Sequence, residues 1–167
     1  MDNTSQLSSK AKTFLSLGLA VGVIFLDQLT KFLAVEFLTP FSPVPVIPNV
    51  LNFTLAFNDR AAFSLGGSTT WFFTLTSTLA ALALLFFVPR FKTRGWLVLG
   101  GLALGGVVGN LVDRLTRAPG FPNGQVVDFI QIPFNFPIFN IADSAICVAA
   151  FLITLRVIRG EKLGGRA

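Results

Sequence analysis

The sequence predicts a mainly α-helical polytopic membrane protein, with four transmembrane helices, a small sheet at the membrane surface and a short interfacial helix. Two observations support this fold class. The 167 residues are 53% hydrophobic and 13% charged, with a mean hydropathy of +0.72, which is too apolar for a soluble domain. The apolar residues also fall into four runs, each close to the roughly 20 residues that a helix needs to cross a bilayer. We expect residues 1–167 to form one membrane-embedded domain.

The first span is expected at about residues 14–35. Lys10 and Lys12 precede it, and a basic segment before an apolar run is also typical of a signal peptide. Because no small-residue cleavage site follows the run, we interpret it as a retained helix. Asp27 and Lys31 lie four residues apart and share one face near the outer end of this helix. They form either an interfacial ion pair, with Lys31 extended to water, or the rim of a polar site.

Two stretches of alternating polarity predict the small sheet. Prolines end helical structure after the first span, and residues 51–58 then alternate strictly between large apolar and small or polar side chains. A second, more weakly alternating stretch follows the third span. We place the sheet in about residues 44–58 and 124–133, with its apolar side towards the membrane. The short interfacial helix is expected at about residues 59–66.

Three further spans complete the expected bundle, at about residues 71–88, 96–113 and 138–158. Within the third span Gly101, Gly105 and Gly109 recur at every fourth position, which clears one face for close contact with another helix. We interpret the first two glycines as packing residues.

A group of polar residues lies at the end of the third span. Gly109 and Asn110 are followed by Asp113 and Arg114. Asn110 and Arg114 share a face at the outer end of the helix, and an Arg–Asp cluster at this depth needs partners. Gly109 therefore belongs with this polar group rather than with packing alone.

The distribution of Lys and Arg predicts that both termini lie in the cytoplasm. The N-terminal segment, the loop at residues 89–95 and the tail from Arg156 carry most of these charges. We therefore attribute the net charge of +5 to membrane orientation and expect no nucleic-acid partner. Polar residues from separate segments then converge at the extracytoplasmic boundary: Asp27, Asn58, Asp113, Asp128, Asn140 and Asp143.

Asp128 and Asp143 are the strongest candidates for chemistry. Carboxylates in apolar surroundings are costly to desolvate unless they are paired or reactive. Pro133, Asn135 and Pro137 lie between them and break regular structure, so that the chain can bring the two together. Two carboxyl groups held close share a proton. One then acts as a general base and the other as a general acid, the minimum for cleaving a peptide with water.

Structural roles would also explain these two aspartates. Asn140 with Asp143 three residues later resembles a capping box at the start of the last helix. Asp143 would then be only an acidic residue favoured by the positive end of the helix dipole. Asp128 would be a solvated residue on a surface strand.

The amino-acid composition excludes several catalytic classes. The chain has no His, so it lacks His-based triads, Cys–His dyads and HExxH zinc sites. Its single Cys, Cys147, lies in an apolar run and leaves no disulfide and no cysteine metal cluster. We expect neither a metal nor a cofactor.

Five stretches resemble, in the same order along the chain, the lipoprotein signal peptidases (signal peptidase II). They are DQLTK from Asp27, NDRAAF from Asn58, GNLVDR from Gly109, VVDF from Val126 and FNIADS from Phe139. The resemblance implies a four-helix aspartic peptidase with a small extracytoplasmic β-cradle. It further implies cleavage of a prolipoprotein signal peptide just before a diacylglyceryl-modified Cys.

The resemblance also implies roles for individual residues. Asp128 and Asp143 match the catalytic pair of the family. Its supporting and substrate-binding positions are matched by Asp27, Lys31, Asn58, Gly109, Asn110, Arg114, Asn140 and Ala142, and we add Asp113 beside Arg114. The implied partners are a lipid-modified prolipoprotein and membrane lipids. The resemblance also implies that the protein is a monomer in the inner (cytoplasmic) membrane of a bacterium.

One position departs from the family pattern, which usually has Gly where this chain has Arg60. Arg is disfavoured where the backbone needs a positive φ. We expect Arg60 to have a negative φ in the interfacial helix and to hold that helix at the membrane surface.

Other classes of function stay open at this point. A small transporter or channel would also hold carboxylates within the membrane, although at the bilayer midplane. A serine–lysine membrane peptidase would use Lys31 with Ser64 or Ser144. A scaffold protein is the third alternative, and it leaves the aspartates unexplained.

Overall fold

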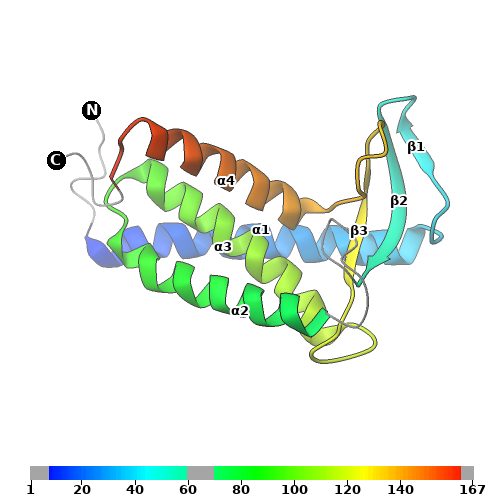
Figure 1. Ribbon diagram of the computed structural model, residues 1–167, viewed down its shortest axis with the longest axis horizontal. Helices are drawn as coiled ribbons and strands as arrows, with labels where there is room; N and C mark the ends of the chain where they lie inside the picture. The colour runs from blue at the N-terminus through cyan, green and yellow to red at the C-terminus, as the bar shows by residue number, and fades with distance from the viewer. Residues whose placement is uncertain (1–7, 60–69, 163–167) are drawn as a thin grey trace.

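Four long apolar helices form the body of the part that the structure describes (Figure 1). The structure is a computed structural model, and it describes residues 8–59 and 70–162. Within these residues the helices that could cross a membrane are α1 (Ser9–Phe37), α2 (Thr70–Phe87), α3 (Arg94–Thr116) and α4 (Ile141–Ile158). A short 3₁₀ helix, η2 (Val88–Arg90), follows α2. The predicted fold class, mainly helical with four spans and a small antiparallel sheet, is confirmed.

α3 is the central helix and contacts α1, α2 and α4. Its glycines make the close approach possible. A Cβ on Gly101 would lie 2.6 Å from the Ser16 carbonyl oxygen of α1, and one on Gly105 would lie 2.6 Å from Val23 Cβ. Gly106 faces α4, where a Cβ would lie 2.5 Å from the Ala142 carbonyl oxygen. The interpretation of Gly101 and Gly105 as packing residues is confirmed.

A three-stranded antiparallel sheet lies at one end of the bundle, opposite the start of α1 and the end of α4 (Figure 1). Its strands, in spatial order, are β1 (Val44–Ile47), β2 (Leu51–Asn58) and β3 (Val126–Gln131). The segment expected in the sheet at 44–58 is thus a hairpin, and its second strand coincides with the alternating residues 51–58. Its turn includes Asn49, whose φ of 59° an Asn adopts more readily than most residues.

The apolar face of the sheet packs against the last turns of α1. Leu55, Val127 and Phe129 form a buried cluster with Ala34. The strict alternation of β2 is interrupted, because the register with β3 shifts between Phe53 and Ala56. Such a bulge gives one strand an extra residue and changes which side chains point inwards.

The start of α4 differs from the prediction. The helix begins at Ile141 rather than at 138, because Asn140 is its N-cap. The expected interfacial helix at about 59–66 lies, apart from Asp59, outside the described residues, and so does Arg60.

Gly105→Ala should weaken the contact between α3 and α1. The added methyl would lie 2.6 Å from Val23 Cβ and 2.8 Å from the Ala20 carbonyl oxygen. The backbone at Ala20 cannot move away without a cost in free energy. We expect the free energy of unfolding to fall by about 1–3 kcal/mol, measured by thermal unfolding in detergent. Gly18→Ala is the matched control, because no atom lies within 4 Å of its added methyl. Equal behaviour of the two variants would contradict the packing role of Gly105.

Candidate active site

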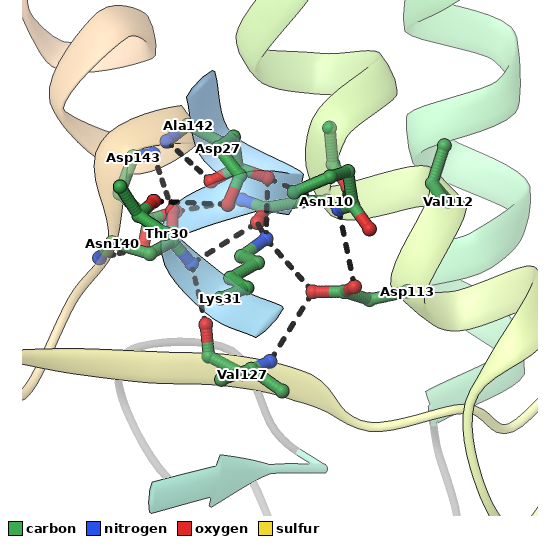
Figure 2. Close-up of polar contacts among 12 residues, drawn as sticks. Asp27, Thr30, Lys31, Asn110, Val112, Asp113, Val127, Asn140, Ala142 and Asp143 are labelled. Atoms are coloured by element: carbon green, nitrogen blue, oxygen red, sulfur yellow. Dashed lines mark hydrogen bonds and ion pairs between the residues drawn. The ribbon is translucent and has the colours of Figure 1, made fainter. Parts of the chain in front are cut away.

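Lys31 is the centre of a buried charged cluster at the end of the bundle that carries the sheet (Figure 2). Its Nζ lies 2.8 Å from Asp27 Oδ2 and 2.8 Å from Asp113 Oδ2, and the three side chains are fully buried. It also donates to Asn110 Oδ1 at 2.9 Å. Lys31 does not extend to water, so the alternative of a simple interfacial ion pair is wrong.

Asp113 connects α3 with both α1 and the sheet. Its Oδ1 accepts from Arg117 Nε at 2.6 Å and from Gln28 Nε2 at 3.2 Å. Its Oδ2 accepts from the Val127 amide of β3 at 3.2 Å. A buried ion must be paired and hydrogen-bonded to offset its desolvation, and Asp113 meets both conditions.

Gln28 and Arg117 belong to this cluster although the sequence prediction did not single them out. Gln28 Nε2 lies 3.0 Å from the Gly109 carbonyl oxygen and 3.2 Å from Asp27 Oδ2. With Arg117 included, the positive charges of Lys31 and Arg117 balance the negative charges of Asp27 and Asp113. The sequence signal for Arg117 was its position four residues after Asp113, on the same helix face.

Asp27 also holds the first turn of α4. Its Oδ1 accepts from the Ala142 amide at 2.9 Å, one of the helix-start N–H groups that lack a partner within the helix. Gly109 provides the space for this contact, because a Cβ there would lie 2.8 Å from Asp27 Oδ2 and 3.2 Å from Ala142 Cβ. The placement of Gly109 with the polar group rather than with helix packing alone therefore agrees with the structure.

Two asparagine side chains connect the charged cluster with Asp128 and Asp143. Asn110 Nδ2 donates to Asp143 Oδ1 at 2.7 Å. Asn140 Nδ2 donates to Asp128 Oδ1 at 2.7 Å and lies 3.1 Å from Asn110 Oδ1. The orientation of the Asn110 amide is set by Lys31, which can only donate, so the amide oxygen faces Lys31 and the NH₂ group faces Asp143.

Asp143 takes part in a capping box, as one structural alternative predicted. Its amide donates to Asn140 Oδ1 at 2.8 Å, and its Oδ2 accepts from the Asn140 amide at 3.2 Å. The other oxygen, Oδ1, remains available for Asn110. Capping and membership of the polar site are therefore compatible in one side chain.

Asp128 is not the solvated surface residue that the other alternative described. It is 2% exposed, and Asn58 Nδ2 donates to its Oδ2 at 2.9 Å. Burial raises the pKa of Asp128 to about 7, and the negative charge of Asp143 acts in the same direction. The hydrogen bonds from Asn58 and Asn140 oppose this increase of the pKa.

Arg114 lies at the edge of the same group. Its Nη1 is 3.4 Å from the Asn110 carbonyl oxygen, and its charge acts on the carboxylates of Asp143 and Asp128. Every residue predicted for the site thus has a contact within one connected network. In the described ranges, 8–59 and 70–162, no three acidic or Cys side chains are placed to hold a metal ion.

The geometry does not favour a serine–lysine pair in the described part of the chain. Ser144 Oγ donates to the Asn140 carbonyl oxygen at 2.9 Å, whereas Lys31 Nζ contacts two carboxylates and an amide oxygen. Ser64, the other predicted partner of Lys31, lies outside the described residues.

Most of the chain matches a known protein family. The model of the family described as signal peptidase (SPase) II matches residues 19–159. The chain belongs to the signal peptidase II family. The predicted resemblance is confirmed, and the transporter and scaffold alternatives are set aside because the family is one of peptidases.

Individual relatives are similar over most of the chain. The lipoprotein signal peptidase of Leifsonia xyli subsp. xyli is 42% identical over 147 residues, which are 88% of this chain and 68% of that protein. The lipoprotein signal peptidase of Mycobacterium avium is 41% identical over 146 residues, 87% of this chain and 80% of that protein. A solved bacterial membrane enzyme is 31% identical, with a TM-score of 0.77 over 86% of this chain and 87% of its own.

Lys31→Met should destabilise the fold. The change leaves Asp27 without its cationic partner and Asp113 with Arg117 alone. Removing one partner of a buried ion pair costs about 3–5 kcal/mol, so the midpoint of thermal unfolding in detergent should fall clearly. Lys10→Met, at an exposed position, is the control and should leave the midpoint unchanged. A Lys31→Met protein as stable as the parent would contradict a structural role for the cluster.

Proposed function

We propose that the protein is an aspartic endopeptidase that removes the signal peptide of lipid-modified prolipoproteins, cutting just before the lipidated Cys. The observation that carries this proposal is the pairing of Asp128 and Asp143 through two asparagine side chains, with a pKa of about 7 for Asp128. Family membership and the names of the relatives support the substrate class.

The two carboxyl groups divide the work of hydrolysis. A pKa near 7 and the repulsion between two close negative charges leave one proton on the pair at neutral pH. The ionised carboxylate takes a proton from water, and the water oxygen then bonds to the scissile carbonyl carbon. The protonated carboxyl donates a hydrogen bond to the carbonyl oxygen and passes its proton to the leaving amine. The proton belongs to the pair, and neither residue is assigned as its permanent holder.

The charged cluster around Lys31 holds this pair in place. Asn110 is bound by Lys31 on one side and binds Asp143 on the other. Asn140 and Asn58 together occupy both oxygens of Asp128. A catalytic pair needs supporting contacts of this kind to keep its geometry within a few tenths of an ångström.

An apolar cavity beside the site suits an acyl chain of the substrate. It has a volume of about 240 Å³ and lies between the end of α1 and the sheet. Leu33, Phe37 and Phe53 are among its lining residues, and so is Phe129, the neighbour of Asp128. Burial of an acyl chain contributes about 0.8 kcal/mol per methylene.

The proposed orientation places both termini in the cytoplasm and the site at the extracytoplasmic boundary. The start of α1 and the end of α4 lie at the opposite end of the bundle from the sheet (Figure 1). That end carries basic residues of the α2–α3 loop and of α4, which favours the cytoplasm. All residues of the proposed site come from one chain, so a monomer in the bacterial cell membrane is sufficient.

Asp128→Asn and Asp143→Asn should each reduce cleavage of a lipidated precursor by at least about a hundredfold, because each removes one proton-transfer group. The measurement is turnover by the purified protein in detergent, with thermal unfolding as a check of folding. Glu36→Gln, an exposed acidic residue of α1, is the control and should keep full activity. Near-normal cleavage by either folded Asp variant would exclude the aspartic mechanism.

The pH dependence of kcat/KM should show an alkaline limb. The reaction needs one proton on the pair, so activity should fall as the pH rises through the pKa of about 7. Asn58→Ala removes a hydrogen bond that lowers the pKa of Asp128, so the limb should move to higher pH. A limb that stays in place, or that moves to lower pH, would contradict the assignment to Asp128.

A precursor with an unmodified Cys should be cut more slowly than the lipidated form. If the cavity binds only a few methylenes, the loss in kcat/KM is at least about tenfold. Parallel kinetics with the two precursors at equal detergent concentration provide the measurement. Equal rates would leave the aspartic mechanism intact but would contradict the proposed dependence on the lipid.

A further inference from the structure

A second cavity lies at the end of the bundle opposite the sheet. Its volume is about 420 Å³, and it is bounded by the first turns of α3 and the last turns of α4. Three arginine side chains line it, Arg94 from α3 and Arg156 and Arg159 from α4. The proposed peptidase mechanism uses none of them.

Below the arginines the cavity is apolar. Val98 from α3 and Leu152 and Leu155 from α4 line this part, and Val98 and Leu152 are exposed on the surface of the bundle. These residues belong to helices that are long and apolar enough to cross a membrane, so we expect their exposed side chains to face lipid. The cavity thus joins a basic end, at the depth of headgroups, to an apolar wall at the depth of acyl chains.

Arg156 is held in this cavity by its neighbours. Its guanidinium crosses Gly95, where a Cβ would collide with it, and its Cζ lies 5.8 Å from the Trp96 ring centroid. Nη1 lies 2.7 Å from Glu161 Oε2. The side chains of Arg156 and Glu161 are 29% and 36% exposed, and an ion pair so accessible to solvent contributes little to stability. A phosphate can therefore replace the Glu161 carboxylate at small cost.

We propose that this cavity binds an anionic phospholipid. The phosphate lies at Arg156 and Arg159, because the planar guanidinium donates two parallel hydrogen bonds to phosphate oxygens. One acyl chain lies along Val98, Leu152 and Leu155. A zwitterionic lipid is disfavoured because its cationic group would meet three arginines and one acidic residue. Basic pockets between transmembrane helices recognise anionic headgroups by this chemistry.

Trp96 allows the proposal to be tested by fluorescence. The chain has two tryptophans, so a Trp71→Phe background leaves Trp96, which lies beside the cavity, as the single emitter. The full-length protein in detergent is titrated with phosphatidylglycerol or phosphatidylcholine that carries bromine atoms on the acyl chains as quenchers. Two arginines bind the phosphate, and each contributes about 1 kcal/mol, or about fivefold, so we expect phosphatidylglycerol to quench Trp96 at a concentration about 25-fold lower than phosphatidylcholine. Equal quenching by the two lipids would overturn the proposal.

Variants distinguish a specific binding site from general attraction of an anionic lipid to a basic surface. Arg159→Gln, at an exposed position, should weaken the preference for phosphatidylglycerol about fivefold, and the double variant with Arg156→Gln should abolish it. Glu161→Gln should strengthen the preference, because it removes the competing carboxylate. Lys10→Gln with Lys12→Gln removes two charges near the start of α1 and should leave the preference unchanged. An equal loss in this control would show that only diffuse surface charge acts.

A final arm distinguishes a lipid from a soluble anion. Millimolar glycerol phosphate has the same phosphate chemistry without acyl chains, and it should not relieve the quenching by brominated phosphatidylglycerol. Relief at that concentration would show a site for free phosphate esters and would overturn the assignment to lipid. Cleavage of a lipidated precursor by Arg159→Gln in detergent should equal that of the parent. The lipid site is therefore tested independently of the proposed peptidase activity.

Discussion

The arrangement of this protein depends on the burial of one lysine between two aspartates. Lys31 Nζ lies at 2.8 Å from both Asp27 and Asp113, with no exposure of the three side chains to solvent. Helices in a membrane gain little from hydrophobic association, because lipid tails are as apolar as the helix surfaces. Close packing at the α3 glycines brings α1 and α3 together, and Lys31 of α1 pairs with Asp113 of α3 across this contact. Asp27 and Asp113 extend the same network to α4 and to β3.

The cluster around Lys31 also affects the surroundings of the Asp128 and Asp143 carboxyl groups. Lys31 orients the Asn110 amide, and that amide in turn presents its donor to Asp143. Asn140 and Asn58 present donors to Asp128 from two other segments of the chain. Desolvation and the neighbouring charge of Asp143 still raise the pKa of Asp128 to about 7. The neutral amides thus hold the carboxyl groups in position without cancelling the rise in the pKa of Asp128.

Much of the fold and of the site could be predicted from the sequence, because the signals are local. Apolar runs indicated the four spans, and alternation indicated β2. The hairpin, the bulge between Phe53 and Ala56 and the burial of Lys31 could not be predicted in this way. Each depends on contacts between segments far apart in the chain. A lysine near the end of a span is locally compatible with water, and only the position of Asp113 in space makes its burial favourable.

Gln28 and Arg117 illustrate the same limit for the site. Gln28 lies in the DQLTK stretch and Arg117 lies four residues after Asp113, but these positions do not show which atoms the side chains contact. Gln28 gains its role only where Gly109 and Asp113 approach it. Asp143 shows the converse, because the local capping pattern was present and did not exclude a second role. For Arg60 the prediction remains open, since it lies outside the described residues.

The hydrogen bond from Asn140 to Asp128 restricts the choice of residue at position 140 more severely than the capping of α4 does. Asn, Asp, Ser and Thr all serve well as N-caps, since each offers an oxygen to the first backbone amides of the helix. Asn140 uses its oxygen in this way and its NH₂ group for Asp128. A hydroxyl or a carboxylate at this position would still start the helix, but neither supplies that pair of functions in the same geometry. Helix initiation alone would tolerate several residue types at this position. The contact between α4 and β3 requires a side-chain amide, because only an amide has both the oxygen acceptor and the NH₂ donor.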